Sequence, residues 1–187
     1  KRQVCNWDIA LTPALITFFG LSINLLVKDI KVIFTEPDNI RLIIVKILTD
    51  QDGLYGVGCA TFTQRPNPVK YAIEDYLKPF LIGKEVSNIE DIWQSSYVSS
   101  YWRNGPVLNN ALSGVDQALW DIKGKMANMP LYDLFGGKTR EAAAVYVHSS
   151  GDSNEEVGDK MQAFIEQGFH HIRVQVSTPG YSTYGNK

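Results

Sequence analysis

The 187-residue chain is 44% hydrophobic and 20% charged, which is typical of a soluble globular protein with a sizeable core in one domain, or in one domain and part of another. Its formal net charge is −2, and the basic and acidic residues are interspersed, which argues against a nucleic-acid-binding surface or a polybasic membrane patch. Cys5 and Cys59 are far apart and form no C-x-x-C motif, so we expect reduced thiols and a cytoplasmic protein rather than a disulfide framework or a zinc site.

The N-terminal segment departs from this composition, because residues 9–27 contain no charged side chain. Their length is sufficient to span a membrane, but a proline, a glycine and an asparagine interrupt the segment. Lys1 and Arg2 precede it as in a signal peptide, although no A-x-A cleavage pattern follows. We interpret residues 1–27 as an atypical hydrophobic extension, with an anchor, an export signal, an upstream extension and a sequence artefact as alternatives.

A regular pattern begins at residue 28 with three successive β-rich stretches. Residues 30–35 (IKVIFT) predict one strand, and residues 39–62 predict two more on either side of the Gln-Asp-Gly turn at residues 51–53. Short turns between successive strands favour antiparallel pairing. The sequence therefore predicts an antiparallel three-stranded meander.

Helical patterns follow the meander. Residues 67–83 predict a helix with a proline near each end. Residues 87–102 predict a second helix, capped by Ser87 or Asn88 and carrying acidic residues in its first turn, where the helix dipole favours anions.

The clearest helix lies in residues 106–129, where apolar side chains recur every three or four residues and form one stripe: Leu112, Val115, Leu119, Ile122 and Met126. Residues 130–137 predict a short helix between Pro130 and a glycine pair. Three strands followed by helices indicate an α+β layer domain over residues 28–138.

The order of elements then changes to strand, helix, strand. Residues 142–150 (AAAVYVHSS) predict a short buried strand, and residues 170–176 predict another. Between them, an amphipathic helix is expected, with Ser153 as its cap and Gly168 as its stop. This arrangement is a βαβ unit, which we expect to be parallel and right-handed.

Several motifs carry a family resemblance. GVDQALWDIKGKMANMPLYDLFGGKTR resembles the signature at the end of the capping domain in the mandelate racemase/muconate lactonizing enzyme branch of the enolase superfamily. GCATFTQRP, LIGKEVSNIEDIWQ and YWRNGPV are similar to the mannonate/gluconate dehydratase group, which includes the starvation-sensing RspA proteins. The resemblance runs from about Ile30 to Gly185 and leaves out the first 27 residues.

The resemblance implies an α+β capping domain over a β/α (TIM) barrel and a lyase acting on a sugar acid (an aldonate). Family members use Mg²⁺ to stabilise the enediolate that forms when a base removes the proton α to a carboxylate. Loss of the 3-hydroxyl then gives a 2-keto-3-deoxy sugar acid. Members of the family are often homo-oligomers.

The chain is too short for a whole barrel, which needs about 250 residues. Residues 139–187 have room for two strands and one helix, whereas the family's metal-binding carboxylates lie at the ends of the third, fourth and fifth strands. We therefore interpret the chain as an N-terminal fragment that lacks Mg²⁺ ligands and is inactive alone. A non-catalytic regulatory, starvation-sensing or interaction protein, or a gene remnant, is the alternative.

The resemblance assigns the catalytic positions to Arg173 and Tyr184. An arginine beside a phenol stabilises the phenolate and lowers the pKa of the tyrosine, so that it can take a proton near neutral pH. By residue type alone, a surface ion pair and a packed loop tyrosine explain the same pattern. His148, at the end of the first expected barrel strand, matches a substrate-binding histidine of the family, and a hydrogen-bonded loop histidine is the alternative.

Further substrate-binding candidates lie in the capping domain. Thr63 and Gln64 occupy the capping loop, where related dehydratases often carry asparagine in place of Thr63; a hydroxyl has one donor where an amide has two. Trp102 could stack on a sugar face, with packing between domains as the alternative. Asp116, Asp121 and Lys123 also lie in the capping domain, on a helix, and are interpreted as structural.

Overall fold

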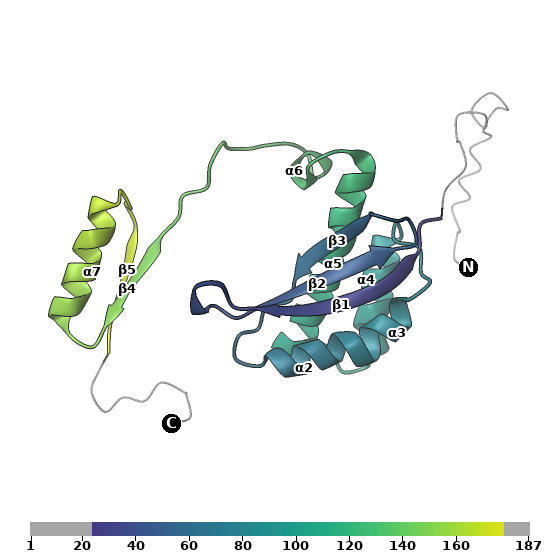
Figure 1. The fold of residues 1–187 in the computed structure, drawn as a ribbon, viewed down its shortest axis with the longest axis horizontal. Coiled ribbons are helices and arrows are strands. Elements are labelled where there is room, and N and C mark those ends of the chain that lie inside the picture. Colours follow the sequence, from purple (N-terminus) through teal and green to yellow (C-terminus); the bar gives the residue numbers. More distant parts are fainter. Residues whose placement is uncertain (1–23, 178–187) are drawn as a thin grey trace, which may run out of the picture. The chain divides into compact units, whose positions relative to one another are not determined.

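The computed structural model describes residues 24–177, which divide into two compact units between Gly137 and Lys138. The first unit contains a three-stranded antiparallel sheet and a set of helices, and the second contains a strand, a helix and a strand (Figure 1). The predicted α+β order of strands followed by helices is confirmed.

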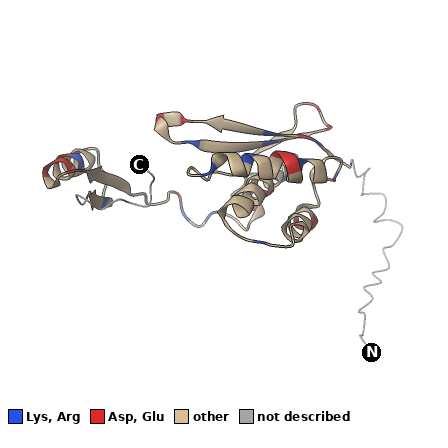
Figure 2. Ribbon diagram, turned by 90° about the horizontal axis from the view of Figure 1, so that it is seen from below, with Lys and Arg blue, Asp and Glu red and all other residues tan. Residues whose placement is uncertain are grey.

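The sheet of the first unit has the order β1-β2-β3 and is antiparallel throughout. Its strands are β1 (Val27–Thr35), β2 (Leu42–Thr49) and β3 (Tyr55–Cys59). A 3-10 turn, η1 (Pro37–Asn39), joins the first two strands. Alternate residues of β2 are buried, because one face of the sheet lies on the core and helices cover that face, as Figure 2 shows.

The helix predicted over residues 67–83 is divided into three consecutive segments: α2 (Pro66–Tyr71), the π-helical η2 (Ala72–Leu77) and α3 (Lys78–Leu81). The N–H of Lys78 donates to the carbonyl of Ile73, five residues earlier. Pro79 gives a physical reason, because it has no N–H and its ring would clash with the carbonyl four residues before it. A wider turn before the proline avoids that clash.

The remaining helices of the first unit are α4 (Ile89–Ser99), α5 (Pro106–Ala127) and α6 (Leu131–Leu134). The expected cap of α4 is confirmed in its position but not in its hydrogen bond. Asn88 holds the N-cap position, but its side chain accepts no hydrogen bond from the helix. Instead, the hydroxyl of Ser87 and the amide of Asn88 both donate to the carboxylate of Glu85.

The apolar stripe of α5 is buried at four of its five predicted positions: Leu112, Val115, Leu119 and Ile122. Met126 is 46% exposed instead. The helix has 22 residues and rises 1.5 Å per residue, so it is longer than the five-residue strand β3 on which it packs. Its last turn therefore extends past the buried stripe.

Glycines let β3 and α5 pack backbone against backbone. A Cβ atom on Gly58 would lie 2.0 Å from the carbonyl oxygen of Gly114. A Cβ atom on Gly56 would lie 1.9 Å from the carbonyl oxygen of Ala118. No larger residue fits at either strand position without moving the helix.

The second unit consists of β4 (Val147–Gly151), α7 (Asn154–Glu166) and β5 (Ile172–Val176), and its two strands are parallel as predicted. The predicted cap of α7 is confirmed, since the hydroxyl of Ser153 accepts a hydrogen bond of 3.1 Å from the N–H of Glu156. The ribbon of α7 is red at its acidic residues in Figure 2, and two of them, Glu155 and Glu156, lie in its first turn. The predicted stop is also confirmed, because Gly168 adopts a φ of +90°.

The strand predicted at residues 142–150 is correct only in part. It begins at Val147 and ends at Gly151. The five residues of β5 pair with residues 147–151, so the preceding alanine-rich residues have no strand in this unit to pair with.

Candidate functional site

The polar face of the second unit brings together two of the residues predicted from the sequence. In the parallel ladder, His148 of β4 lies directly opposite Arg173 of β5. Residues paired in this way project their side chains from the same face of the sheet. Both side chains are exposed.

The other face of this strand pair is covered by α7. Ser149 is fully buried, and its hydroxyl donates a 2.7 Å hydrogen bond to the carbonyl of Val157 in α7. Because side chains alternate along a strand, His148 and Arg173 point away from α7. The helix therefore leaves the His148–Arg173 face open.

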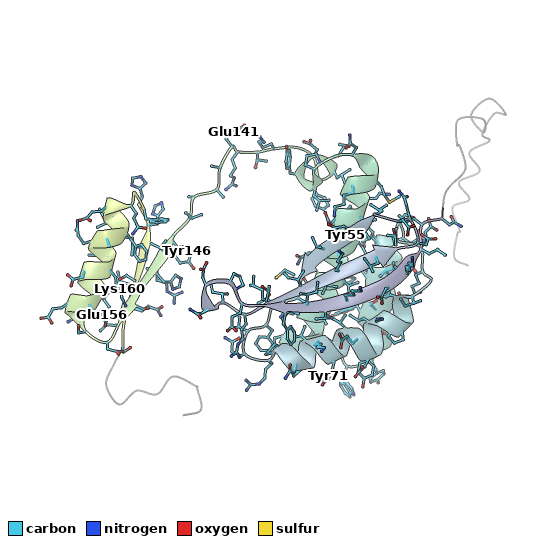
Figure 3. All side chains as sticks on the ribbon, in the orientation of Figure 1. Tyr55, Tyr71, Glu141, Tyr146, Glu156 and Lys160 are labelled. Atoms are coloured by element: carbon cyan, nitrogen blue, oxygen red, sulfur yellow. The ribbon has the colours of Figure 1, made fainter. Side chains whose placement is uncertain are left out.

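An ion pair within α7 is hydrogen-bonded to the end of β4. Lys160 donates to the carbonyl of Ser150 at 2.8 Å and to the carboxylate of Glu156 at 2.6 Å; Figure 3 labels both charged side chains on α7. The hydrogen bond from Lys160 and a second one from the N–H of Asp152 lower the pKa of the Glu156 carboxyl. These contacts hold β4 against α7 on the side opposite His148.

The sequence suggested that His148 is the last residue of its strand, and this prediction is wrong. It is the second residue of β4, and Arg173 is the second residue of β5. The predicted strand was placed too early in the sequence, since β4 extends through Gly151. Both side chains therefore lie within the ladder rather than on the loops that follow it.

Tyr146 is a neighbour of His148 that the sequence analysis did not single out. The two rings are stacked, with centroids 5.2 Å apart and planes at 27°, and Figure 3 labels the tyrosine beside β4. The spacing of two residues, which places side chains on one face of an extended chain, is the signal that could have found it. Stacking restricts the orientation of the imidazole ring.

The expected partner of Arg173, Tyr184, lies outside residues 24–177. The geometry of the predicted Arg173–Tyr184 pair is therefore not part of the described structure.

The loop that follows β3 carries Thr63 and Gln64. Thr63 is half-buried and Gln64 is exposed, in a turn directly before α2. The guanidinium of Arg65 donates 2.7 Å to the carbonyl of Gln64, and the N–H of Arg65 donates to the carbonyl of Phe62 at 3.1 Å. These bonds fold the chain back at Thr63 and Gln64.

Side chains of α5 fix the strand from which this loop starts. The amide of Gln117 accepts from the N–H of Cys59 at 3.1 Å and donates to its carbonyl at 3.3 Å, as a neighbouring strand would. Asp121 accepts from the N–H of Val57 at 2.8 Å. Lys125 donates to Asp121 at 2.7 Å and to the carbonyl of Tyr55 at 2.8 Å. The outer edge of β3 is thus satisfied by one helix face.

A hollow of about 360 Å³ lies beside this loop, between the β1–β2 turn and the start of α2. Arg41 and Glu36 line it and are paired, with 3.2 Å between Nε and Oε1. Pro66 and Asn67, just after the Thr63–Gln64 turn, form another part of its wall. The sequence analysis did not single out Arg41 or Glu36, because nothing in the sequence shows that these two loops are neighbours.

Trp102 lies in the loop between α4 and α5 and is 81% exposed. Its ring meets that of Tyr101 edge-on, with centroids 5.3 Å apart. Trp102, Thr63 and Gln64 all belong to the first unit, whereas His148 and Arg173 belong to the second.

Asp121 of α5 has the structural role that we expected, because it bonds to β3 and to Lys125. Asp116 differs, because burial and, to a smaller extent, the charge of Glu90 raise the pKa of its carboxyl. It lines a small hollow with Trp93 and Tyr97, whose rings are stacked 5.0 Å apart.

Residues 24–177 contain no group of three or more His, Cys, Asp or Glu side chains that could hold a metal ion. The described residues therefore do not fit a Mg²⁺ site. Within the same range, no helix is both long enough and apolar enough to cross a membrane. Most of the uncharged segment at residues 9–27 precedes that range.

Comparison with known families gives one match over most of the first unit. The N-terminal domain of the mandelate racemase/muconate lactonizing enzyme family matches residues 21–136. This range includes the sheet, helices α2 to α6 and the Thr63–Gln64 loop.

The chain is also similar to curated proteins. A D-galactonate dehydratase family member from Enterococcus gallinarum is 58% identical over 156 residues, which are 83% of this chain and 39% of that protein. The D-galactonate dehydratase family member RspA from Pantoea ananatis is 57% identical over 157 residues, or 84% of this chain and 38% of that protein. The chain thus spans about two fifths of the length of these relatives.

Solved structures show the same fold. An enolase from Pantoea ananatis with bound D-gluconate and Mg is 57% identical, with a TM-score of 0.77 over 82% of this chain and 37% of that one. A member of the enolase superfamily from Salmonella Typhimurium is 27% identical, with a TM-score of 0.71 over 81% of this chain and 42% of that one.

Proposed function

This chain belongs to the mandelate racemase/muconate lactonizing enzyme family of the enolase superfamily, and from that membership we propose that it is part of a sugar-acid dehydratase. Residues 28–138 would be the capping domain, and residues 139–187 the first strands and helix of the barrel. The observation that carries the proposal is the pairing of His148 with Arg173 on the open face of β4 and β5.

The proposed reaction removes water from an aldonate such as D-mannonate or D-gluconate. A base takes the proton from the carbon α to the carboxylate, and the electron pair passes into an enediolate. The 3-hydroxyl then takes up a proton from an acid and leaves as water, and the resulting enol tautomerises to a 2-keto-3-deoxy acid. D-Gluconate bound to a similar enolase and the dehydratase names of the curated relatives support this substrate class.

Arg173 is the residue that we assign to proton abstraction together with Tyr184. A guanidinium stays protonated at all relevant pH values, so it favours a nearby phenolate over the neutral phenol. His148, directly opposite on the neighbouring strand, can hydrogen-bond a substrate oxygen. Tyr146, stacked on its ring, would orient that hydrogen bond.

The capping domain would contribute substrate contacts through Thr63, Gln64 and Trp102. The hydroxyl and the amide offer hydrogen bonds to sugar hydroxyls, and the exposed indole offers a flat apolar face. Mg²⁺ is the proposed cofactor of the full-length family, but we assign none of its ligands to residues 24–177, which contain no suitable cluster.

The first test of this proposal is the activity of the 187-residue chain alone with Mg²⁺ and D-mannonate or D-gluconate. We expect no 2-keto-3-deoxy acid to form, because the enediolate would lack its stabilising cation. Turnover would contradict the proposal that this chain alone is inactive for want of a complete Mg²⁺ site.

The second test is a chimera in which the matched part of this chain replaces the corresponding 157 residues or so of the Pantoea ananatis relative. We expect the chimera to dehydrate the same aldonates as that relative. If the chimera is folded but inactive, and calorimetry shows that the chain alone binds an aldonate without Mg²⁺, the result would favour a non-catalytic binding protein instead.

A further inference from the structure

A cavity of about 380 Å³ lies in the first unit between η2, α4 and α5. Apolar side chains form much of its wall, among them Leu77, Leu108, Ala111 and Leu112. Its volume is within the range of small-molecule sites in proteins, which are mostly apolar with a few polar groups. None of the site residues predicted from the sequence lines it.

One buried polar group in this wall lacks a partner. Ser96 of α4 is 6% exposed, and its hydroxyl makes no hydrogen bond with any described residue. A buried hydroxyl without a partner costs free energy, and native structures rarely keep one without a reason. A ligand atom that bonds to this hydroxyl would remove that cost.

The charge at the cavity favours an anion. Arg103 is the only charged residue among the described residues that line it. Its guanidinium lies 5.5 Å from the centre of the Tyr97 ring, which fixes its place at the wall. Asn104, whose side-chain oxygen is 3.0 Å from the Tyr97 hydroxyl, and Asn109 add amide groups beside it.

The backbone around the cavity is irregular on two sides. The π-helical segment η2 contributes Ala72 and Tyr76 to the wall, and π-turns recur at functional sites. On the other side, Asn104 has a φ of +76°, in the left-handed region that non-glycine residues seldom adopt. Such strained positions cluster at binding sites, where the surrounding structure maintains them.

We propose that this cavity is a binding site for a small carboxylate with an apolar body. The carboxylate would pair with Arg103 and the neighbouring amides, and the apolar body would fill the space lined by Leu77, Ala111 and Leu112. A sugar acid does not fit this description, because its hydroxyls would lose their hydrogen bonds to water against the apolar wall. The site is therefore separate from that of the proposed dehydratase substrate.

Titration of the 187-residue chain with phenylacetate, followed by amide NMR spectra, tests the proposal. We expect saturable shifts at Ser96, Arg103 and Asn104, with a dissociation constant of about 1 mM for a ligand of this size. D-Gluconate at the same concentrations should leave these resonances unchanged. No saturable shift up to about 20 mM phenylacetate, or equal shifts with gluconate, would overturn the proposal.

The charge requirement is tested by Arg103→Gln, which should weaken phenylacetate binding about tenfold through loss of a charge-assisted hydrogen bond. The matched control is Arg140→Gln, which removes an exposed arginine of the second unit and should bind like the unmodified chain. Phenylacetamide, a neutral analogue, should also bind the unmodified chain about tenfold more weakly, and this comparison needs no folded variant. Equal affinity for the amide and the acid would refute the role of Arg103.

Discussion

Replacing Gly58 with alanine should destabilise the first unit strongly, because the added methyl group has no space. Its Cβ would lie 2.0 Å from the carbonyl oxygen of Gly114, whereas ordinary contacts begin at 3.4 Å. The two backbones would have to separate by about 1.4 Å at this point. That movement would stretch the bonds between Gln117 and Cys59, which are already 3.1 and 3.3 Å long.

The expected loss in the free energy of unfolding is about 4 kcal/mol. Overpacking costs about 1–3 kcal/mol, and losing two hydrogen bonds costs about 1 kcal/mol each. The entropic gain of alanine over glycine in the unfolded chain offsets less than about 1 kcal/mol of this total. Because Gln117 would no longer hold Cys59 at the end of β3, the loop that carries Thr63 and Gln64 should also become less well ordered.

Urea unfolding followed by tryptophan fluorescence measures this effect, because Trp93 on α4 and Trp120 on α5 report on the first unit and residues 138–187 contain no tryptophan. The matched control is Gly83→Ala, at a residue with a φ of +79° and no atom within 4 Å of an added Cβ. It should cost about 1–2 kcal/mol through backbone strain alone. A loss below 1 kcal/mol for Gly58→Ala would refute the close packing of β3 on α5.

Three further changes test local features of the two units. Ser153→Ala should cost the second unit about 1 kcal/mol by removing the cap of α7, with faster amide exchange in its first turn as the measure. The hydrogen bond from Lys78 lowers the pKa of Asp29, so the pair stabilises the folded chain when the pH is above 3.8, the ordinary pKa of an aspartate. That stabilisation is lost as the pH falls through the lower pKa of the folded state. Lys78→Met should therefore flatten the acid limb of the stability–pH curve measured by urea unfolding. Burial raises the pKa of Asp116, so its ionisation opposes folding as pH rises above 3.8. Asp116→Asn should therefore be more stable than the unmodified chain by a larger margin at pH 7 than at pH 3.5.

The sequence predicts those parts of the fold that leave a local pattern in the chain. The buried stripe of α5 follows from a period of 3.6 residues, and the three strands of the meander follow from β-rich stretches joined by short turns. The start of β4 does not, because residues 142–146 have strand-like composition but no strand to pair with. The π-helical turn before Pro79 was also missed, since a proline only shows that a helix must change and not how.

The candidate site was predictable in its residue types but not in its contacts. The family resemblance supplied His148 and Arg173, and the ladder then placed them opposite each other. The position of the Arg41–Glu36 pair beside the capping loop depends on tertiary packing, which one sequence does not encode in a readable pattern, whereas Tyr146 could have been found from its spacing of two residues to His148.

The most direct test of the proposed function is the kcat of the chimera with the Pantoea ananatis relative, compared with that of its Arg173→Lys variant. Lysine keeps the charge but loses the planar guanidinium, so we expect kcat for aldonate dehydration to fall by at least about 100-fold. Arg140→Lys in the same chimera is the matched control and should keep the full rate. An Arg173→Lys chimera that dehydrates aldonates at the unmodified rate would contradict the assignment of Arg173 to proton abstraction.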